Sequence, residues 1–105
     1  MEIIGIPHFT DQLHHCLEDE EYSALQWFLC RKPDAGDLIR GTGDARKVRW
    51  ASKNKGKSGG VRTIYFHHTP KGQIWMLAIY PTSEKEDLSA QDKRVLKEII
   101  VEIKK

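Results

Sequence analysis

The sequence has no long hydrophobic run: no apolar stretch in its 105 residues is long enough to span a bilayer. The residues before Pro7 lack both a basic segment and an extended apolar segment, so they do not indicate a secretory signal peptide. We therefore expect a cytoplasmic protein without membrane attachment. The only two cysteines, Cys16 and Cys30, do not form a Cys-x-x-Cys pair, and we expect both to be reduced, apolar core residues.

The sequence also lacks the signatures of common cofactor-binding and hydrolytic sites. It contains no Gly-x-Ser-x-Gly element, no P-loop and no dinucleotide-binding fingerprint. Histidines stand side by side at positions 14–15 and 67–68, and adjacent side chains on a helix or strand point in different directions. Neither pair has the spacing of zinc ligands, so we expect no metal and no other cofactor.

Positive charge is concentrated in one part of the chain. The formal net charge is only +2, yet residues 40–62 contain eight basic residues and a single acid, Asp44. This concentration favours a polyanionic partner such as nucleic acid. The alternative is a loop that is basic only for solubility. The strand-like segments on either side favour the first interpretation, because they would hold the basic segment against a sheet.

Hydrophobic periodicity predicts a single α+β domain over residues 1–105, and its first part is a strand followed by two helices. Three isoleucines form a short strand that Pro7 should end. Thr10 is a suitable N-cap for the first helix, and the acidic run 18–21 favours the start of the second. The second helix should stop before Pro33 and lead into a loop.

The remainder of the chain predicts three strands and a final helix. Residues 47–51 alternate between polar and apolar side chains, as in a half-buried strand. Residues 61–68 and 74–80 flank a turn and should form an antiparallel hairpin, with 74–80 as a central strand buried on both faces. A capping box that begins at Ser89 should start a C-terminal helix with an apolar stripe facing the core.

The basic segment contains side chains that can act on a phosphodiester. Lys47 and Arg49 are two residues apart on a strand, so they project from one face, and Arg62 joins them if the register permits. Three fixed cations can clamp a phosphodiester and stabilise the added negative charge of its transition state. RNA brings its own nucleophile, the 2′-OH, so the protein needs positioning and charge more than a covalent residue. A lysine among these cations can serve as general base.

Aromatic side chains near this segment have two possible roles. They can stack on RNA bases, or they can form the core of the sheet. The candidates are Trp50, Tyr65, Phe66 and Tyr80.

Three segments together resemble the HigB branch of the RelE/HigB toxins, which belong to type II toxin–antitoxin systems. Residues 36–51 (GDLIRGTGDARKVRWA) resemble the segment that leads into the second strand of these toxins. Residues 53–66 (KNKGKSGGVRTIYF) are similar to the Lys/Gly-rich loop and third strand of the branch. Residues 79–89 (IYPTSEKEDLS) are similar to its strand-end motif, usually Tyr-(Gly/Pro)-Lys-x-Glu-x-x-Asp-Leu.

The resemblance implies a RelE-like α+β fold, with a small, mostly antiparallel sheet packed against helices. It also implies a metal-independent, ribosome-dependent mRNA endoribonuclease that inhibits translation. The implied partners are the ribosome, mRNA and a cognate antitoxin that is encoded beside the toxin and carries a DNA-binding domain.

The resemblance also implies roles for individual residues. Lys47 and Arg49 take the positions of the base and of charge stabilisation, Arg62 clamps the phosphate, and Lys85 stands in for a later basic residue. The residues expected to bind RNA are Arg46, Lys53, Lys55, Lys57 and Tyr65.

The chain departs from the family pattern at three positions. Thr82 stands where the branch usually has lysine, Ser83 where RelE toxins have arginine, and Ser89 where they have a catalytic tyrosine. The general acid is therefore open, with Lys55, Lys57 or Tyr65 as possibilities. Two alternative functions remain: a non-catalytic module that binds RNA or antitoxin, as in a degenerate toxin, and a ParE-like inhibitor of DNA gyrase.

Overall fold

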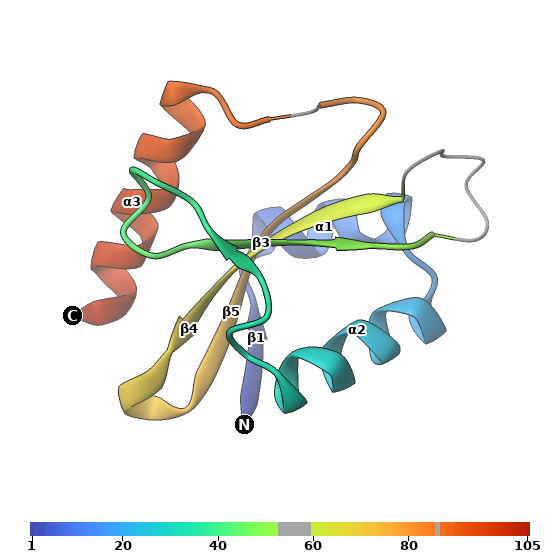
Figure 1. Ribbon diagram of the computed structural model, residues 1–105, viewed down its shortest axis with the longest axis horizontal. Helices are drawn as coiled ribbons and strands as arrows, with labels where there is room; N and C mark the ends of the chain where they lie inside the picture. The colour runs from blue at the N-terminus through green and yellow to red at the C-terminus, as the bar shows by residue number, and fades with distance from the viewer. Residues whose placement is uncertain (53–59, 86) are drawn as a thin grey trace.

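The computed structural model describes residues 1–52, 60–85 and 87–105 and confirms the predicted α+β class (Figure 1). The lysines at 53, 55 and 57 lie outside the described residues, so their predicted contact with RNA stays a prediction. A two-residue strand at 37–38 and a short 3₁₀ turn are additions to the predicted order. The elements are β1 (Glu2–Gly5), α1 (Pro7–Cys16), α2 (Asp19–Arg31), β2 (Asp37–Leu38), β3 (Arg46–Trp50), β4 (Val61–His68), the 3₁₀ turn (Thr69–Lys71), β5 (Gln73–Pro81) and α3 (Ala90–Lys104).

The five strands form one sheet in the order β1-β5-β4-β3-β2. β1 runs parallel to β5, and all other neighbours are antiparallel, as expected for a mostly antiparallel sheet. The predicted hairpin is β4–β5, which occupies the interior of the sheet. Among the described residues no helix is both long and apolar enough to cross a membrane.

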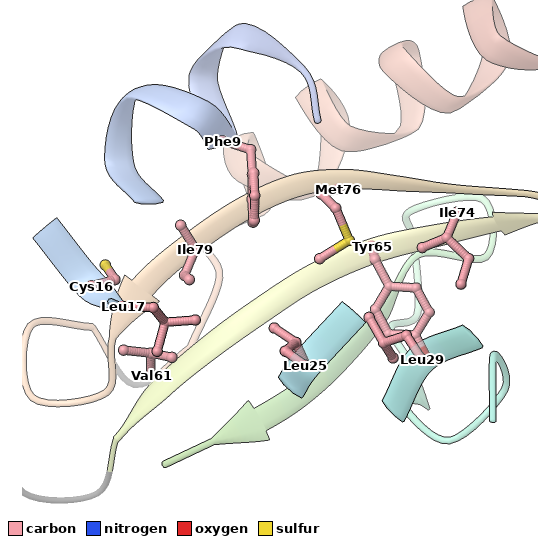
Figure 2. Close-up of a cluster of buried hydrophobic side chains, with 10 residues drawn as sticks. All are labelled: Phe9, Cys16, Leu17, Leu25, Leu29, Val61, Tyr65, Ile74, Met76 and Ile79. Carbon is pink, nitrogen blue, oxygen red and sulfur yellow. The ribbon is translucent and has the colours of Figure 1, made fainter. Parts of the chain in front are cut away.

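Helices cover the two faces of the sheet unequally. On one face, α1 and α2 bury a cluster with the strands, shown in Figure 2. On the other face, α3 buries a second cluster. This cluster includes Ile64 of β4 and Leu96 on the apolar side of α3. The residues of the first cluster are Phe9, Cys16, Leu17, Leu25, Leu29, Val61, Tyr65, Ile74, Met76 and Ile79.

The predicted start of the first helix is wrong by one turn. α1 begins at Pro7 with Ile6 as its N-cap, and Thr10 lies inside the helix, where its hydroxyl donates to the Ile6 carbonyl at 3.2 Å. Proline is well suited to the first helical position, since its fixed φ matches the helix and its missing N–H would be unsatisfied there anyway. Pro7 therefore ends the strand, as predicted, by starting the helix.

The other predicted helix boundaries are confirmed. Glu18 and Glu21 form a capping box at the start of α2, and this helix ends at Arg31, before Pro33. Ser89 and Asp92 form the predicted box at α3, with the Asp92 N–H donating to the Ser89 hydroxyl at 3.1 Å. Carboxylates in these first turns also interact favourably with the helix dipole.

A β-bulge in β5 changes the direction of its last side chains. Ile64 of β4 pairs with Ala78, and the next residue, Tyr65, pairs with Met76, so Leu77 is an extra residue in β5. Leu77 and Ala78 consequently both pack on the α3 side, although they are consecutive. Past the bulge, Ile79 faces α1 and α2, and Tyr80 faces α3. Strict alternation from Met76 predicts the reverse.

Candidate functional site

A row of residues crosses three strands on the face that α3 partly covers. Arg49 of β3 pairs with Arg62 of β4, and Arg62 pairs with Tyr80 of β5. Directly opposed residues project from the same face, with Cβ atoms roughly 5 Å apart. Lys47 faces Ile64 one pair further along, so its side chain projects from this face as well. The prediction that Arg62 comes alongside Lys47 and Arg49 is confirmed; we call these three residues the cationic row.

The cationic row is accessible because α3 packs further along the sheet. Ile64 and Phe66 lie beneath α3, and the helix ends with the Lys104 ammonium 5.6 Å from the centre of the Phe66 ring. Arg49 is exposed, and Lys47 and Arg62 are half-buried. An anion can therefore approach the row from solvent, while the sheet holds the bases of its side chains in fixed positions.

The segment after β5 brings Lys85 to the edge of this site. The Lys85 ammonium forms an ion pair with Asp92 in the first turn of α3, and it lies 5.7 Å from the centre of the Tyr80 ring. Ser83 is exposed, and Ser89 is engaged as the α3 N-cap. Lys85 therefore lies beside Tyr80, which is the cross-strand partner of Arg62.

A carboxylate from the same segment lies within electrostatic reach of the row. The Leu88 N–H donates to the Asp87 carboxylate at 2.8 Å, and this hydrogen bond is the main reason that the pKa of Asp87 is below its usual value. The positive charges of Lys47, Lys93 and Arg62 lower this pKa further. The family motif contains this aspartate, but its distance from the row could not be inferred from sequence.

The Tyr80 hydroxyl is a buried polar group beside the row. Its hydroxyl oxygen is buried and makes no well-aligned hydrogen bond within the described part of the chain. Burial raises the pKa of Tyr80 above its usual value of 10. The positive charge of Arg62, the polar interaction of its side chain with the hydroxyl, and the charge of Lys85 act in the opposite direction. The sequence indicated Tyr80 only as a stacking surface or core residue, because neither the bulge nor the burial is visible in the pattern.

Two residues expected to bind RNA lie on the opposite face. Arg46 of β3 pairs with Tyr65 of β4. Because Arg46 is the residue next to Lys47 on the strand, its side chain projects from the opposite face of the sheet. Tyr65 is fully buried; its hydroxyl donates to the Pro33 carbonyl at 2.8 Å and accepts from the Gly36 N–H at 2.9 Å. The Arg46 guanidinium donates to the Gly36 carbonyl at 2.8 Å. Both side chains stabilise the loop after α2, and we remove both from the proposed RNA-binding surface and Tyr65 from the possible acids.

Two further aromatic candidates are also structural. The rings of Trp50 and Phe28 lie 5.4 Å apart, where β3 packs on α2. Phe66 is only 4% exposed and belongs to the cluster under α3. Tyr80 is thus the one member of the four that borders the cationic row.

A cleft of about 530 Å³ adjoins Tyr80 and Lys85 on the side away from the cationic row. It lies between α1 and α3, and β5 forms part of its wall. Most of the lining is apolar, with His8 and Gln12 contributed by α1. In the ranges 1–52, 60–85 and 87–105, no three histidine, cysteine or acidic side chains are grouped to hold a metal ion.

Comparison with known proteins gives a match in structure but not in family model. No family model matches the sequence. A chain of the intact E. coli RelBE toxin–antitoxin complex is similar over 76% of this chain and 94% of its own length, with a TM-score of 0.58 and 15% identity. The free E. coli toxin RelE, in a variant with two arginines replaced by alanine, is similar over 81% and 86%, with a TM-score of 0.57 and 16% identity.

The chain has the RelE fold. At 15% and 16% identity, the similarity establishes the RelE fold and leaves the activity to be argued from the site. The two RelE structures do not distinguish the HigB branch, which stays a prediction from the sequence motifs.

Proposed function

We propose that this protein is the toxin of a toxin–antitoxin module and that it cleaves mRNA on the ribosome. The observation that carries the proposal is the cationic row, in which Lys47, Arg49 and Arg62 share one accessible sheet face. The RelE fold supports it, because the neighbouring structures are a toxin and a toxin–antitoxin complex.

The proposed reaction uses the 2′-OH of the RNA as the nucleophile. Arg62, in the middle of the row, binds the scissile phosphate, and Arg49 neutralises the charge that develops on its oxygens. Lys47 accepts the proton of the 2′-OH. Lys85 contributes positive charge beside the Tyr80 ring. These groups hold the RNA in line for attack, which is the main requirement when the substrate supplies its own nucleophile.

The partners follow from the same proposal. A cognate antitoxin, encoded beside the toxin and carrying a DNA-binding domain, neutralises the protein; the RelBE complex is the structural support for such a partner. The ribosome and its mRNA are the substrate complex. The site of action is the cytoplasm, where ribosomes are found.

The test is to map mRNA 5′ ends after brief induction of the protein. We compare the wild type with Arg62→Ala and with Lys71→Ala, which removes an exposed cation from the 3₁₀ turn, away from the cationic row. We expect new 5′ ends within translated frames for the wild type and Lys71→Ala, and loss of these ends for Arg62→Ala. Growth arrest with intact mRNA would contradict the proposed activity.

One observation favours a second function, a binding module without catalysis. Ser89, at the position of the family's catalytic tyrosine, uses its hydroxyl to cap α3. If no other residue supplies a proton, the cationic row binds ribosomal RNA without cutting mRNA. This function predicts salt-sensitive ribosome binding without new 5′ ends.

A further inference from the structure

The Tyr80 side chain lies beside Arg62, the residue that we propose to bind the scissile phosphate. The bulge at Leu77 turns Tyr80 to the α3 face, where it stands directly opposite Arg62. Its oxygen is buried and makes no well-aligned hydrogen bond among residues 1–52, 60–85 and 87–105. The polar neighbour of this oxygen is the Arg62 side chain, so the hydroxyl lies beside the group that we propose to bind phosphate.

The two cations beside Tyr80 suit it for releasing a proton. The guanidinium of Arg62, on β4, lowers the pKa of the Tyr80 hydroxyl through its positive charge. The ammonium of Lys85 lies 5.7 Å from the centre of the Tyr80 ring. When the hydroxyl loses its proton, both positive charges stabilise the phenolate. Before the reaction, burial favours the neutral form, so the proton is present at neutral pH.

We infer that Tyr80 is the general acid of the proposed ribonuclease and protonates the 5′-oxygen that leaves the scissile phosphate. This inference rests on the proposed function and supplies the role that Ser89 does not fill. The cross-strand pairing of Arg62 with Tyr80 fits this role, because the side chains of directly opposed residues project from the same face close to each other.

The 2′-oxygen gives its proton to the general base and attacks phosphorus, and a bond from phosphorus to the 2′-oxygen forms. The bond from phosphorus to the 5′-oxygen breaks, and this oxygen takes the proton of the Tyr80 hydroxyl. The products are a 2′,3′-cyclic phosphate and a free 5′-hydroxyl. Tyr80 is left as a phenolate, which regains a proton from water.

Contact with RNA requires a small rearrangement, because the Tyr80 oxygen is buried in the free protein. The rearrangement that we propose is a displacement of the Lys85 side chain, which is 41% exposed and lies against the Tyr80 ring. A phosphate bound by Arg62 attracts the Lys85 ammonium, so substrate binding itself favours the movement. Geometry of a catalytic hydrogen bond often becomes productive only in the substrate complex.

The decisive experiment changes the leaving group. Ribosomes carrying a synthetic mRNA are treated with wild type and Tyr80→Phe, using mRNA with either the normal 5′-oxygen or a bridging 5′-sulfur at the cleaved position. A thiolate leaves without protonation, so it does not need a general acid. We expect Tyr80→Phe to slow cleavage of the normal mRNA by at least about 100-fold. We expect cleavage of the sulfur-containing mRNA to stay within about threefold of the wild type, in keeping with a general acid that this substrate does not need.

Other outcomes overturn the inference in distinguishable ways. Equal slowing on both substrates, or no slowing on either, rejects Tyr80 as the acid while the ribonuclease stands. Arg62→Ala provides the matched control and should slow both substrates, since phosphate binding is needed for each. If the wild type cleaves neither mRNA, the proposed function itself fails, and the inference with it.

A second variant covers the possibility that Tyr80→Phe does not fold. Replacing Tyr80 by a fluorinated tyrosine keeps the hydroxyl and the shape and lowers the pKa of the phenol. The basic limb of the pH–rate profile should then move to lower pH, and an unmoved limb rejects the role. The charged and titratable groups that face Tyr80 stay unchanged in this comparison: Arg62 of β4, His8 of α1, Lys85, Asp87 and Asp92.

Discussion

Arg49 and Arg62 stand directly opposite each other across β3 and β4, so two positive charges share one cross-strand pair. Like charges in such a pair destabilise a sheet by roughly 0.2–1 kcal/mol. An anion bound beside this pair would offset the repulsion between the two charges.

The first prediction is that Arg49→Gln stabilises the protein while it weakens function. The substitution keeps most of the side chain of an exposed residue and removes the repulsion. We expect the free energy of unfolding in urea to rise by roughly 0.2–1 kcal/mol at low salt and the gain to shrink at high salt. Lys71→Ala is the control and should show no such gain. A fall in stability for Arg49→Gln would mean that Arg49 has a structural partner.

The second prediction concerns Tyr65 as a structural residue. Tyr65→Phe removes a hydroxyl that both donates to the Pro33 carbonyl and accepts from the Gly36 N–H, and it leaves that buried N–H unpaired. We expect a loss of about 1–3 kcal/mol in the free energy of unfolding. Ribosome binding, measured where the variant is folded, should be unchanged. Weaker binding by folded protein would restore Tyr65 to the RNA-binding surface.

The third prediction concerns salt and ribosome binding. In the proposed function, Lys47 and Arg49 each neutralise one phosphate. Each phosphate contact adds about 0.7–0.9 to the slope of log K against log salt concentration. Lys47→Ala and Arg49→Ala should each reduce this slope by about that amount, and Lys71→Ala should leave it unchanged. Sedimentation with purified ribosomes at several salt concentrations measures the slope. An unaltered slope for both variants would place RNA elsewhere on the molecule.

The fourth prediction concerns acid stability. Lys85 and, next, the Ser89 N–H hold the pKa of Asp92 below its usual value of 3.8. A carboxyl group with a lowered pKa in the folded protein contributes stability above its unfolded pKa, and this contribution is lost as the pH falls through the folded value. The loss should therefore occur below about pH 4. Asp92→Asn should lower stability at pH 7 and flatten the fall in stability below pH 4, measured by urea unfolding across pH. If the free energy of unfolding fell with pH in the same way for Asp92→Asn as for the wild type, Asp92 would be excluded as a source of the acid sensitivity.

Sequence patterns predicted those elements whose side chains alternate without interruption. The faces of β3 followed from alternation, and the capping box at Ser89 located α3. The same alternation places Arg46 on the face of Val48 and Trp50, opposite to the face of Lys47. The sequence could therefore have predicted that Arg46 points away from the cationic row, and this prediction was missed. β2 has only two residues, Asp37 and Leu38, which is too short for any periodicity to reveal.

The sequence predicted the three cations of the candidate site, but it did not predict the position of its tyrosine. Lys47, Arg49 and Arg62 required only two-residue periodicity and an antiparallel pairing. Tyr80 required knowledge of the bulge, and β5 is so uniformly apolar around Leu77 that no residue type marks the irregularity. The charges that act on the Tyr80 hydroxyl come from β4 and from the segment after β5, which local sequence does not connect.

The extra residue in β5 also determines how homologous chains should be compared. If a relative lacks the bulge, an ungapped alignment equates its strand residues one for one with those of this chain, yet beyond Leu77 the equated residues face opposite sides of the sheet. A tyrosine that occupies the same place in space as Tyr80 would then lie one position away in the alignment. Searches for a shared proton donor should therefore match positions by cross-strand partner, taking the residue opposite Arg62, and not by counting along the sequence.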